Sequence, residues 1–159
     1  MRATRMAAVI ASGVAFLGTA QAGDVAIIVH RNHPQSEVSM AELGRIFRLD
    51  QQHWKSGDKV DLILQVSGSA KDELILDRVY RMKAEDLRPF WLGKVFRGEL
   101  TAPPRTFASD SSVRQFVSQS LKAVGYIDSV LLDDSVKALR IDGKRPGEPG
   151  YPLARAASP

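Results

Sequence analysis

The sequence contains no cysteine among its 159 residues. Disulfides, thiolate catalysis and cysteine-ligated metal sites are therefore excluded in any compartment. The sequence also has no P-loop, no dinucleotide fingerprint and no serine in the Gly-x-Ser-x-Gly context of a nucleophile elbow. Because no nucleophile–base pair is visible, a hydrolase is poorly supported and we predict no catalytic residue. We expect a protein that is not an enzyme.

Metal-ligating side chains are also sparse. The only histidines are His30, His33 and His53. The spacing of His30 and His33 could suit a metal, but no third ligand is close in sequence, and a zinc site needs three or four. We therefore expect histidines at the surface or in loops, no metal site and no cofactor.

The N-terminal segment has the features of a cleavable export signal. Arg2 and Arg5 precede an apolar run from Met6 to Leu17, and small residues follow up to Ala22. The run is shorter than the roughly 20 residues that cross a membrane, which argues against an anchor. We expect cleavage after Ala22, a periplasmic or secreted protein, and no membrane insertion of the mature form.

The remaining chain has the length of one domain. Hydrophobic residues make up 44% of the sequence, which permits a core. Loss of Arg2 and Arg5 with the signal lowers the formal net charge from +4 to about +2, so the basicity does not indicate nucleic acid. Beyond Asp142 the chain holds four of its eight prolines and little that could pack. We expect a domain over residues 23–142 and a proline-rich tail, extended or disordered, over residues 143–159.

Strand and helix patterns alternate within that domain. Apolar runs predict strands over residues 24–30, 59–66, 124–127 and 135–141. Helical spacing predicts helices after Ser39, from residue 70, over residues 84–96 and after Ser109, with a capping box formed by Ser39 and Glu42. The alternation predicts an α/β domain with three layers, in which helices cover both faces of a mostly parallel sheet.

A Ser/Gly turn joins the second expected strand to the next helix, in the segment Val66-Ser67-Gly68-Ser69-Ala70-Lys71. Unpaired N–H groups at a helix start, the positive end of the helix dipole and neighbouring hydroxyls together suit an anion. A serine that only caps the helix explains the same pattern and is the commoner case. The residues alone leave both interpretations open.

Several segments, taken in order, resemble the phosphate-binding component of bacterial ABC uptake systems. They are Asn32 to Phe47, the loop with Trp54 and Gly57, Val60 to Ser69, Gly125-Tyr126-Ile127, Val136 to Gly143, and Tyr151-Pro152-Leu153. The likeness covers nearly the whole mature chain and fits the short, single-lobe members of the periplasmic-binding-protein-like superfamily. The resemblance implies a fold like one lobe of a type II periplasmic binding protein.

The resemblance also implies binding of phosphate or a related oxyanion. The ligand-binding residues would be Ser67, Gly68 and Ser69, as N–H and hydroxyl donors, and Lys71, as a charge. Lysine is a point charge where the family's arginine clasps an oxyanion bidentately, and Asp72 adds an unhelpful negative charge. Because one lobe cannot bury its ligand, we expect weak affinity unless a second copy or a partner lobe completes the cleft.

A second hypothesis is a non-catalytic interaction module that kept this fold and lost the ligand. It would dock on an envelope protein, through its tail or its exposed cleft face. The two hypotheses differ in whether the Ser67–Lys71 loop is open and lined by donors or plugged by Asp72 and its neighbours.

Overall fold

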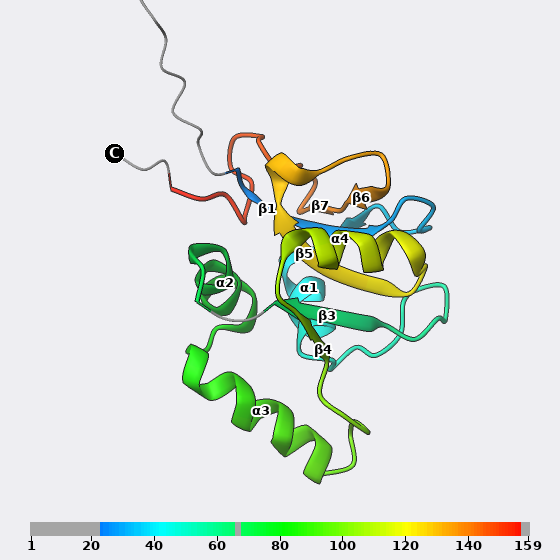
Figure 1. The fold of residues 1–159 in the computed structure, drawn as a ribbon, viewed down its shortest axis with the longest axis vertical. Helices are drawn as coiled ribbons and strands as arrows, with labels where there is room; N and C mark the ends of the chain where they lie inside the picture. Colours follow the sequence, from blue (N-terminus) through cyan, green and yellow to red (C-terminus); the bar gives the residue numbers. More distant parts are fainter. Residues whose placement is uncertain (1–22, 66–67, 157–159) are drawn as a thin grey trace, which may run out of the picture.

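The computed structural model describes residues 23–65 and 68–156. The predicted export signal, Ser67 and the last three residues of the predicted tail lie outside the described residues. The strands are β1 (Val25–His30), β2 (Glu37–Val38), β3 (Asp61–Gln65), β4 (Arg105–Phe107), β5 (Ala123–Asp128), β6 (Val136–Ala138) and β7 (Arg140–Ile141) (Figure 1). The helices are α1 (Met40–Phe47), α2 (Ala70–Ile75), the π-helical η1 (Leu76–Tyr80), α3 (Ala84–Phe96), α4 (Asp110–Gln119) and the 3-10 turn η2 (Ser129–Leu131). Among these helices, none is long and apolar enough to span a membrane.

The central sheet has the strand order β4-β3-β5-β1-β6. β3 pairs in parallel with β4 and β5, whereas β1 is antiparallel to both β5 and β6. Four strands therefore point the same way and β1 alone runs opposite, so the predicted mostly parallel sheet is confirmed with one exception. An apolar run such as that of β1 looks the same in either direction, which is why the pattern could not reveal the reversal.

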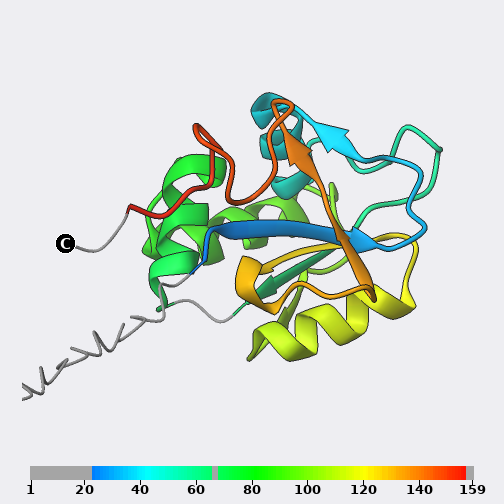
Figure 2. The same cartoon turned by 90° about the horizontal axis from the view of Figure 1, so that it is seen from above.

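Helices cover both faces of this sheet, as predicted (Figure 2). Alternate residues of β1 point to opposite faces. Val25, Ile27 and Val29 belong to the larger core, shared with α1, α2, η1 and α3. Ala26 and Ile28 belong to the smaller core under α4. The fold is a three-layer α/β/α domain.

Serine N-caps begin three of the helices. Ser39, Ser69 and Ser109 each accept a hydrogen bond on the side chain from the N–H of the residue three positions later. The reciprocal bond of a capping box forms at Ser69 but, among the described residues, not at Ser39. Glu42 instead accepts a hydrogen bond from Gln35 Nε2 at 3.2 Å, so the capping box predicted there forms only its serine half.

Gly125 allows α4 to pack closely on β5. A Cβ atom at this position would lie 2.7 Å from Cγ1 of Val113, a distance at which one of the two elements must shift. Because α4 begins at Asp110, this close approach also brings the start of α4 against the end of β5.

The C-terminal segment packs against the first strand. Tyr151 and Leu153 are buried in the larger core. Val25 N donates to the carbonyl oxygen of Leu153 (3.1 Å), and Tyr151 donates its hydroxyl to the carbonyl oxygen of Val25 (2.8 Å). The prediction that little beyond Asp142 packs is therefore wrong for the described residues. Two well-placed apolar side chains are enough to dock a segment whose average composition is that of a tail.

Candidate functional site

The carboxyl ends of three parallel strands meet at one edge of the sheet. The chain leaves β3 for the Ser/Gly turn, leaves β4 for Asp110, and ends β5 at Asp128. In open α/β sheets, ligands bind in the crevice outside this edge. The loop predicted to bind an anion therefore lies where the fold class places its ligands.

The described part of the loop is exposed and shaped for a tight turn. Gly68 has φ +132°, a conformation that favours glycine, and Gly68 and Ser69 are both exposed. Ser69 Oγ accepts from Asp72 N (3.2 Å), and the Asp72 carboxylate accepts from Ser69 N (3.4 Å). The Ser69 O–H remains a donor, and the N–H groups of Ala70 and Lys71 have no intrahelical acceptor because they begin the helix.

Lys71 lies behind this loop rather than in it. Only 6% of the residue is exposed. Its ammonium donates to Gln65 Oε1 at 2.8 Å and forms a short ion pair with Asp110 Oδ1. The ammonium also lies 5.7 Å from the centroid of the Tyr126 ring. The one cation predicted to attract a ligand already has a carboxylate partner.

Asp110 is an anion held by three donors. Its Oδ1 accepts from Lys71 and from Gln65 Nε2 (2.5 Å), and its Oδ2 accepts from Asp128 N (3.0 Å). Burial opposes ionisation, but the hydrogen bonds from Lys71, the Asp128 N–H and Gln65 outweigh it and lower the pKa of Asp110. An ammonium, an amide and a backbone N–H are the groups that bind oxyanions in proteins. Here an internal carboxylate occupies them.

Asp72 is also satisfied within the fold. Tyr126 donates its hydroxyl to Asp72 Oδ1 at 2.8 Å, and both side chains are buried. Burial first, and then the charge of Asp72, raises the pKa of Tyr126, so the phenol remains a proton donor. The carboxylate of Asp72 therefore supports the start of α2 and has both oxygens engaged.

The structure brings some of the predicted site residues together and separates others. Gly68 and Ser69 share the exposed turn, Lys71 is buried below it, and Ser67 lies outside the described residues. Sequence reasoning missed Gln65 and gave Asp110 no role in the site. The available signal was positional, since Gln65 stands at the carboxyl end of a predicted strand and Asp110 at the start of a predicted helix.

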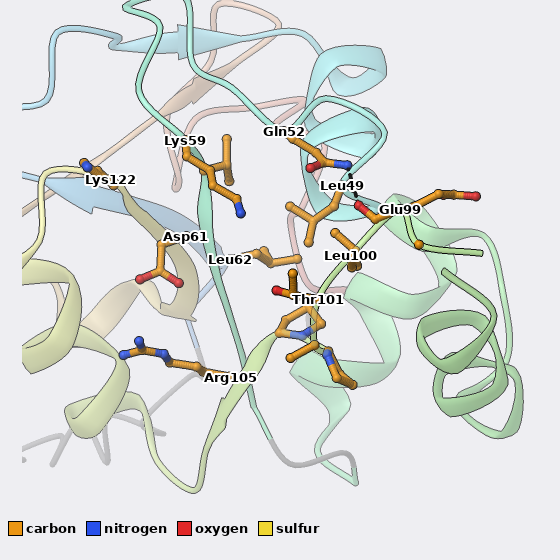
Figure 3. Close-up of a pocket in the computed structure, with 15 residues that line it drawn as sticks. Leu49, Gln52, Lys59, Asp61, Leu62, Glu99, Leu100, Thr101, Arg105 and Lys122 are labelled. Carbon is orange, nitrogen blue, oxygen red and sulfur yellow. Dashed lines mark hydrogen bonds between the residues drawn. The ribbon is translucent and has the colours of Figure 1, made fainter. Parts of the chain in front are cut away.

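A separate cavity of about 480 Å³ lies at the opposite end of β3 (Figure 3). Asp61, at the cavity, and Gln65, beside the loop, are the two ends of β3 and lie roughly 13 Å apart, since each of the four steps between them rises about 3.3 Å. Figure 3 shows basic side chains and Asp61 along one side and leucines along the other. The cavity is lined by three cations, Lys59, Arg105 and Lys122, and by two carboxylates, Asp61 and Glu99, so it has no single-sign field for an anion.

The histidines do not form a metal site among the residues that the structure describes. His33 lies in a loop, as expected, but is buried rather than at the surface. Its ring meets that of Trp54 edge-on, with centroids 4.4 Å apart, and its Nδ1 accepts from Gln35 N at 3.2 Å. Burial lowers the pKa of His33, so the ring is a neutral packing group.

No family model matches the sequence, and no curated protein matches it. Solved structures nevertheless share the fold. A candidate phosphate ABC transporter substrate-binding protein from Clostridium perfringens, with bound phosphate, superposes with a TM-score of 0.64 at 22% identity. An ABC-type phosphate transport receptor from Vibrio cholerae gives 0.63 at 20% identity, and PstS from Borrelia burgdorferi gives 0.59 at 16%.

These alignments cover 79% of this chain. They cover 47%, 49% and 50% of the three matched chains, so this chain spans about half the length of each. At these identities the likeness establishes the fold. The resemblance to phosphate-binding components of ABC transporters is thereby confirmed at the level of fold, for one lobe.

Proposed function

We propose that this chain is a phosphate-binding-protein-like single lobe that acts in the periplasm or outside the cell. It binds phosphate or another oxyanion weakly at the loop from Ser67 to Lys71, and it is not an enzyme. The observation that carries the proposal is the position of this loop. It leaves the carboxyl edge of β3 and enters a capped helix, in a fold shared with a phosphate-bound structure.

The internal pairing of Lys71 explains why the affinity is weak. An anion at the loop meets the Ser69 hydroxyl and first-turn N–H groups, while the nearest buried cation is neutralised by Asp110. A ligand must bind without that charge or compete with a carboxylate that three donors already hold. In addition, one lobe leaves the ligand open to water, which weakens each hydrogen bond.

A specific observation favours a second candidate, the interaction module. Lys71, Asp72 and Asp110 satisfy one another and their neighbours, so this edge of the sheet is electrostatically complete without a ligand. A domain of this kind would retain its fold and use its surface for an envelope protein or a second copy of itself.

Calorimetric titration of the purified protein with phosphate and with sulfate tests the proposal, with the mass in solution measured in parallel. We expect saturable heat with millimolar affinity that Ser69→Ala removes, since the variant loses a donor from the loop. Ser39→Ala is the matched control, because it deletes the same kind of N-cap from α1. We also expect Asp110→Asn to tighten phosphate binding, since it frees the charge of Lys71.

Flat titrations at millimolar phosphate, in both the wild type and Asp110→Asn, would contradict oxyanion binding and support the interaction module. Saturable binding by a dimer alone would show that a second copy completes the cleft.

A further inference from the structure

Four arginines line an open groove between α1 and η1. Arg45 and Arg48 come from the last turn and C-cap of α1, and Arg78 and Arg81 from the end and C-cap of η1. The groove has a volume of about 550 Å³, and its remaining lining is Met40, Ala41, Gly44 and Val79. It shares no described residue with the Ser/Gly turn.

Both arginine pairs border the groove. Arg45 and Arg48 are three positions apart at the end of α1 and lie on the same face of that helix. Arg78 lies in the last turn of the π-helical η1, and Arg81 follows it as the C-cap residue. α1 packs against η1 at Gly44, where a Cβ atom would lie 3.5 Å from the carbonyl oxygen of Val79. The absence of a side chain at residue 44 lets α1 and η1 approach closely at the groove.

None of the four guanidinium groups has a carboxylate within 4.0 Å among the described residues. Arg48 donates to the carbonyl oxygen of Tyr80 (3.0 Å), and Arg78 donates to the carbonyl oxygen of Pro152 (2.6 Å). These neutral acceptors orient the side chains without cancelling their charge. Asp77 lines the adjoining hollow, and Asp142 accepts from Met40 N at 3.1 Å beside the groove. Two carboxylates leave part of the positive charge of four arginines uncompensated.

A cation at a helix C-terminus ordinarily offsets the negative end of the dipole. Compensation of the dipole accounts for one arginine at the end of each helix. It does not account for a second arginine at each end, nor for the two helix ends lining the same groove. Arg81 also has φ 54° and ψ 46°, a left-handed conformation in which glycine is the usual C-cap residue.

We propose that this groove binds a diphosphate group, either free or carried by a nucleotide. A guanidinium fork matches phosphate oxygens bidentately, whereas lysine offers only a point charge. Two pairs of arginines require a ligand with at least two linked anionic groups, and the volume is that of a small-molecule site. Single phosphate ions would leave part of the charge unmatched.

Calorimetric titration with pyrophosphate, phosphate and ADP tests the proposal on the purified protein at low ionic strength. We expect pyrophosphate to bind at least about tenfold more tightly than phosphate, because each additional charge-assisted hydrogen bond is worth at least that factor. Arg45→Gln with Arg81→Gly should weaken pyrophosphate binding by at least about tenfold for the same reason. The second substitution also places glycine where the backbone favours it, so the variant should fold.

The matched control is Arg31→Gln with Arg88→Gln, which removes two exposed arginines outside the groove. It should leave the pyrophosphate affinity unchanged. Equal losses in both double variants, equal affinities for pyrophosphate and phosphate, or no binding of pyrophosphate would overturn the proposal. ADP binding as tightly as pyrophosphate would identify a nucleotide-borne group, and much weaker ADP binding a free diphosphate.

The groove and the Ser/Gly turn are tested independently. Ser69→Ala is expected to abolish the phosphate signal of the proposed oxyanion site and to leave pyrophosphate binding intact. The double arginine variant is expected to weaken pyrophosphate binding by at least about tenfold and to leave the phosphate signal of the oxyanion site unchanged.

Discussion

The molecule contains two basic regions that differ in whether their charge is available. Lys71 is 6% exposed and paired with Asp110, whereas the four arginines of the groove have no carboxylate partner among the described residues. Lys71, at the position of a cation in the family motif, is paired inside the fold. The four arginines, which belong to no motif, line an open groove. A charge attracts a ligand only to the extent that the fold leaves it uncompensated.

The largest expected effect is the loss of stability on removing the Asp110 carboxylate, which pairs with Lys71 and has no counterpart in the arginine groove. Asp110→Ala leaves Lys71 buried without a counter-charge, and breaking a buried ion pair in this way costs about 3 kcal/mol or more. Urea unfolding of the variant and the wild type measures the loss. Asp133→Ala is the control, because it breaks an exposed pair with Arg114 at the surface. Similar losses in the two variants would contradict the assignment of Lys71 to the buried network.

The sequence predicted the elements of this fold better than their pairings. The three serine N-caps were predictable because a cap depends on residues only three positions apart. The Lys71–Asp110 pair was not, because its partners are 39 positions apart and meet only when α2 and α4 pack at the same edge of the sheet. The arginine groove escaped notice for the same reason. Arg45 and Arg81 each look like solvated helix residues until α1 meets η1.

Pyrophosphate should stabilise the wild-type protein if the charges of the four groove arginines are available to a ligand. At a ligand concentration 100 times the dissociation constant, the free energy of unfolding rises by about 2.7 kcal/mol. Thermal unfolding with and without pyrophosphate measures this increase. At the same concentration, a tenfold weaker site in Arg45→Gln with Arg81→Gly should reduce the increase to about 1.4 kcal/mol, and a larger loss of affinity should reduce it further. An equal increase in the variant would place the ligand elsewhere.

The two regions should also differ in their response to acid. The pKa of Asp110 is lower in the folded protein than in the unfolded chain. Its contribution to the free energy of unfolding is therefore complete at pH values above the pKa of an ordinary aspartate, and it is lost as the pH falls through the pKa of the folded state. The stability difference between the wild type and Asp110→Ala should therefore be constant above about pH 5 and shrink below about pH 4. Urea unfolding at several pH values measures the difference.

The arginine groove supplies the comparison for this experiment. The double arginine variant removes no carboxylate, so its effect on the free energy of unfolding should not follow the acid-dependent change expected for Asp110→Ala. A constant effect of Asp110→Ala down to about pH 3 would show that its carboxylate is not held by the charge of Lys71.

The smallest expected effect concerns Arg81 alone. Replacing it with glycine removes the strain of a left-handed residue with a side chain, and one of four mutually repelling charges, so stability should rise by about 1 kcal/mol. Arg88→Gly lies inside α3 and should lower stability by about the same amount. A loss of stability in Arg81→Gly would mean that the Arg81 side chain supports the fold, and that the groove is less open than its arginines suggest.

The docking of the C-terminal segment on β1 determines when the domain can become native. The hydrogen bond from Tyr151 to Val25 joins positions 126 residues apart, and Leu153 fills the core beside it. Contacts over such separations form late and slow folding. The larger core is therefore incomplete until the segment with Tyr151 and Leu153 docks on β1, however early the first strand forms.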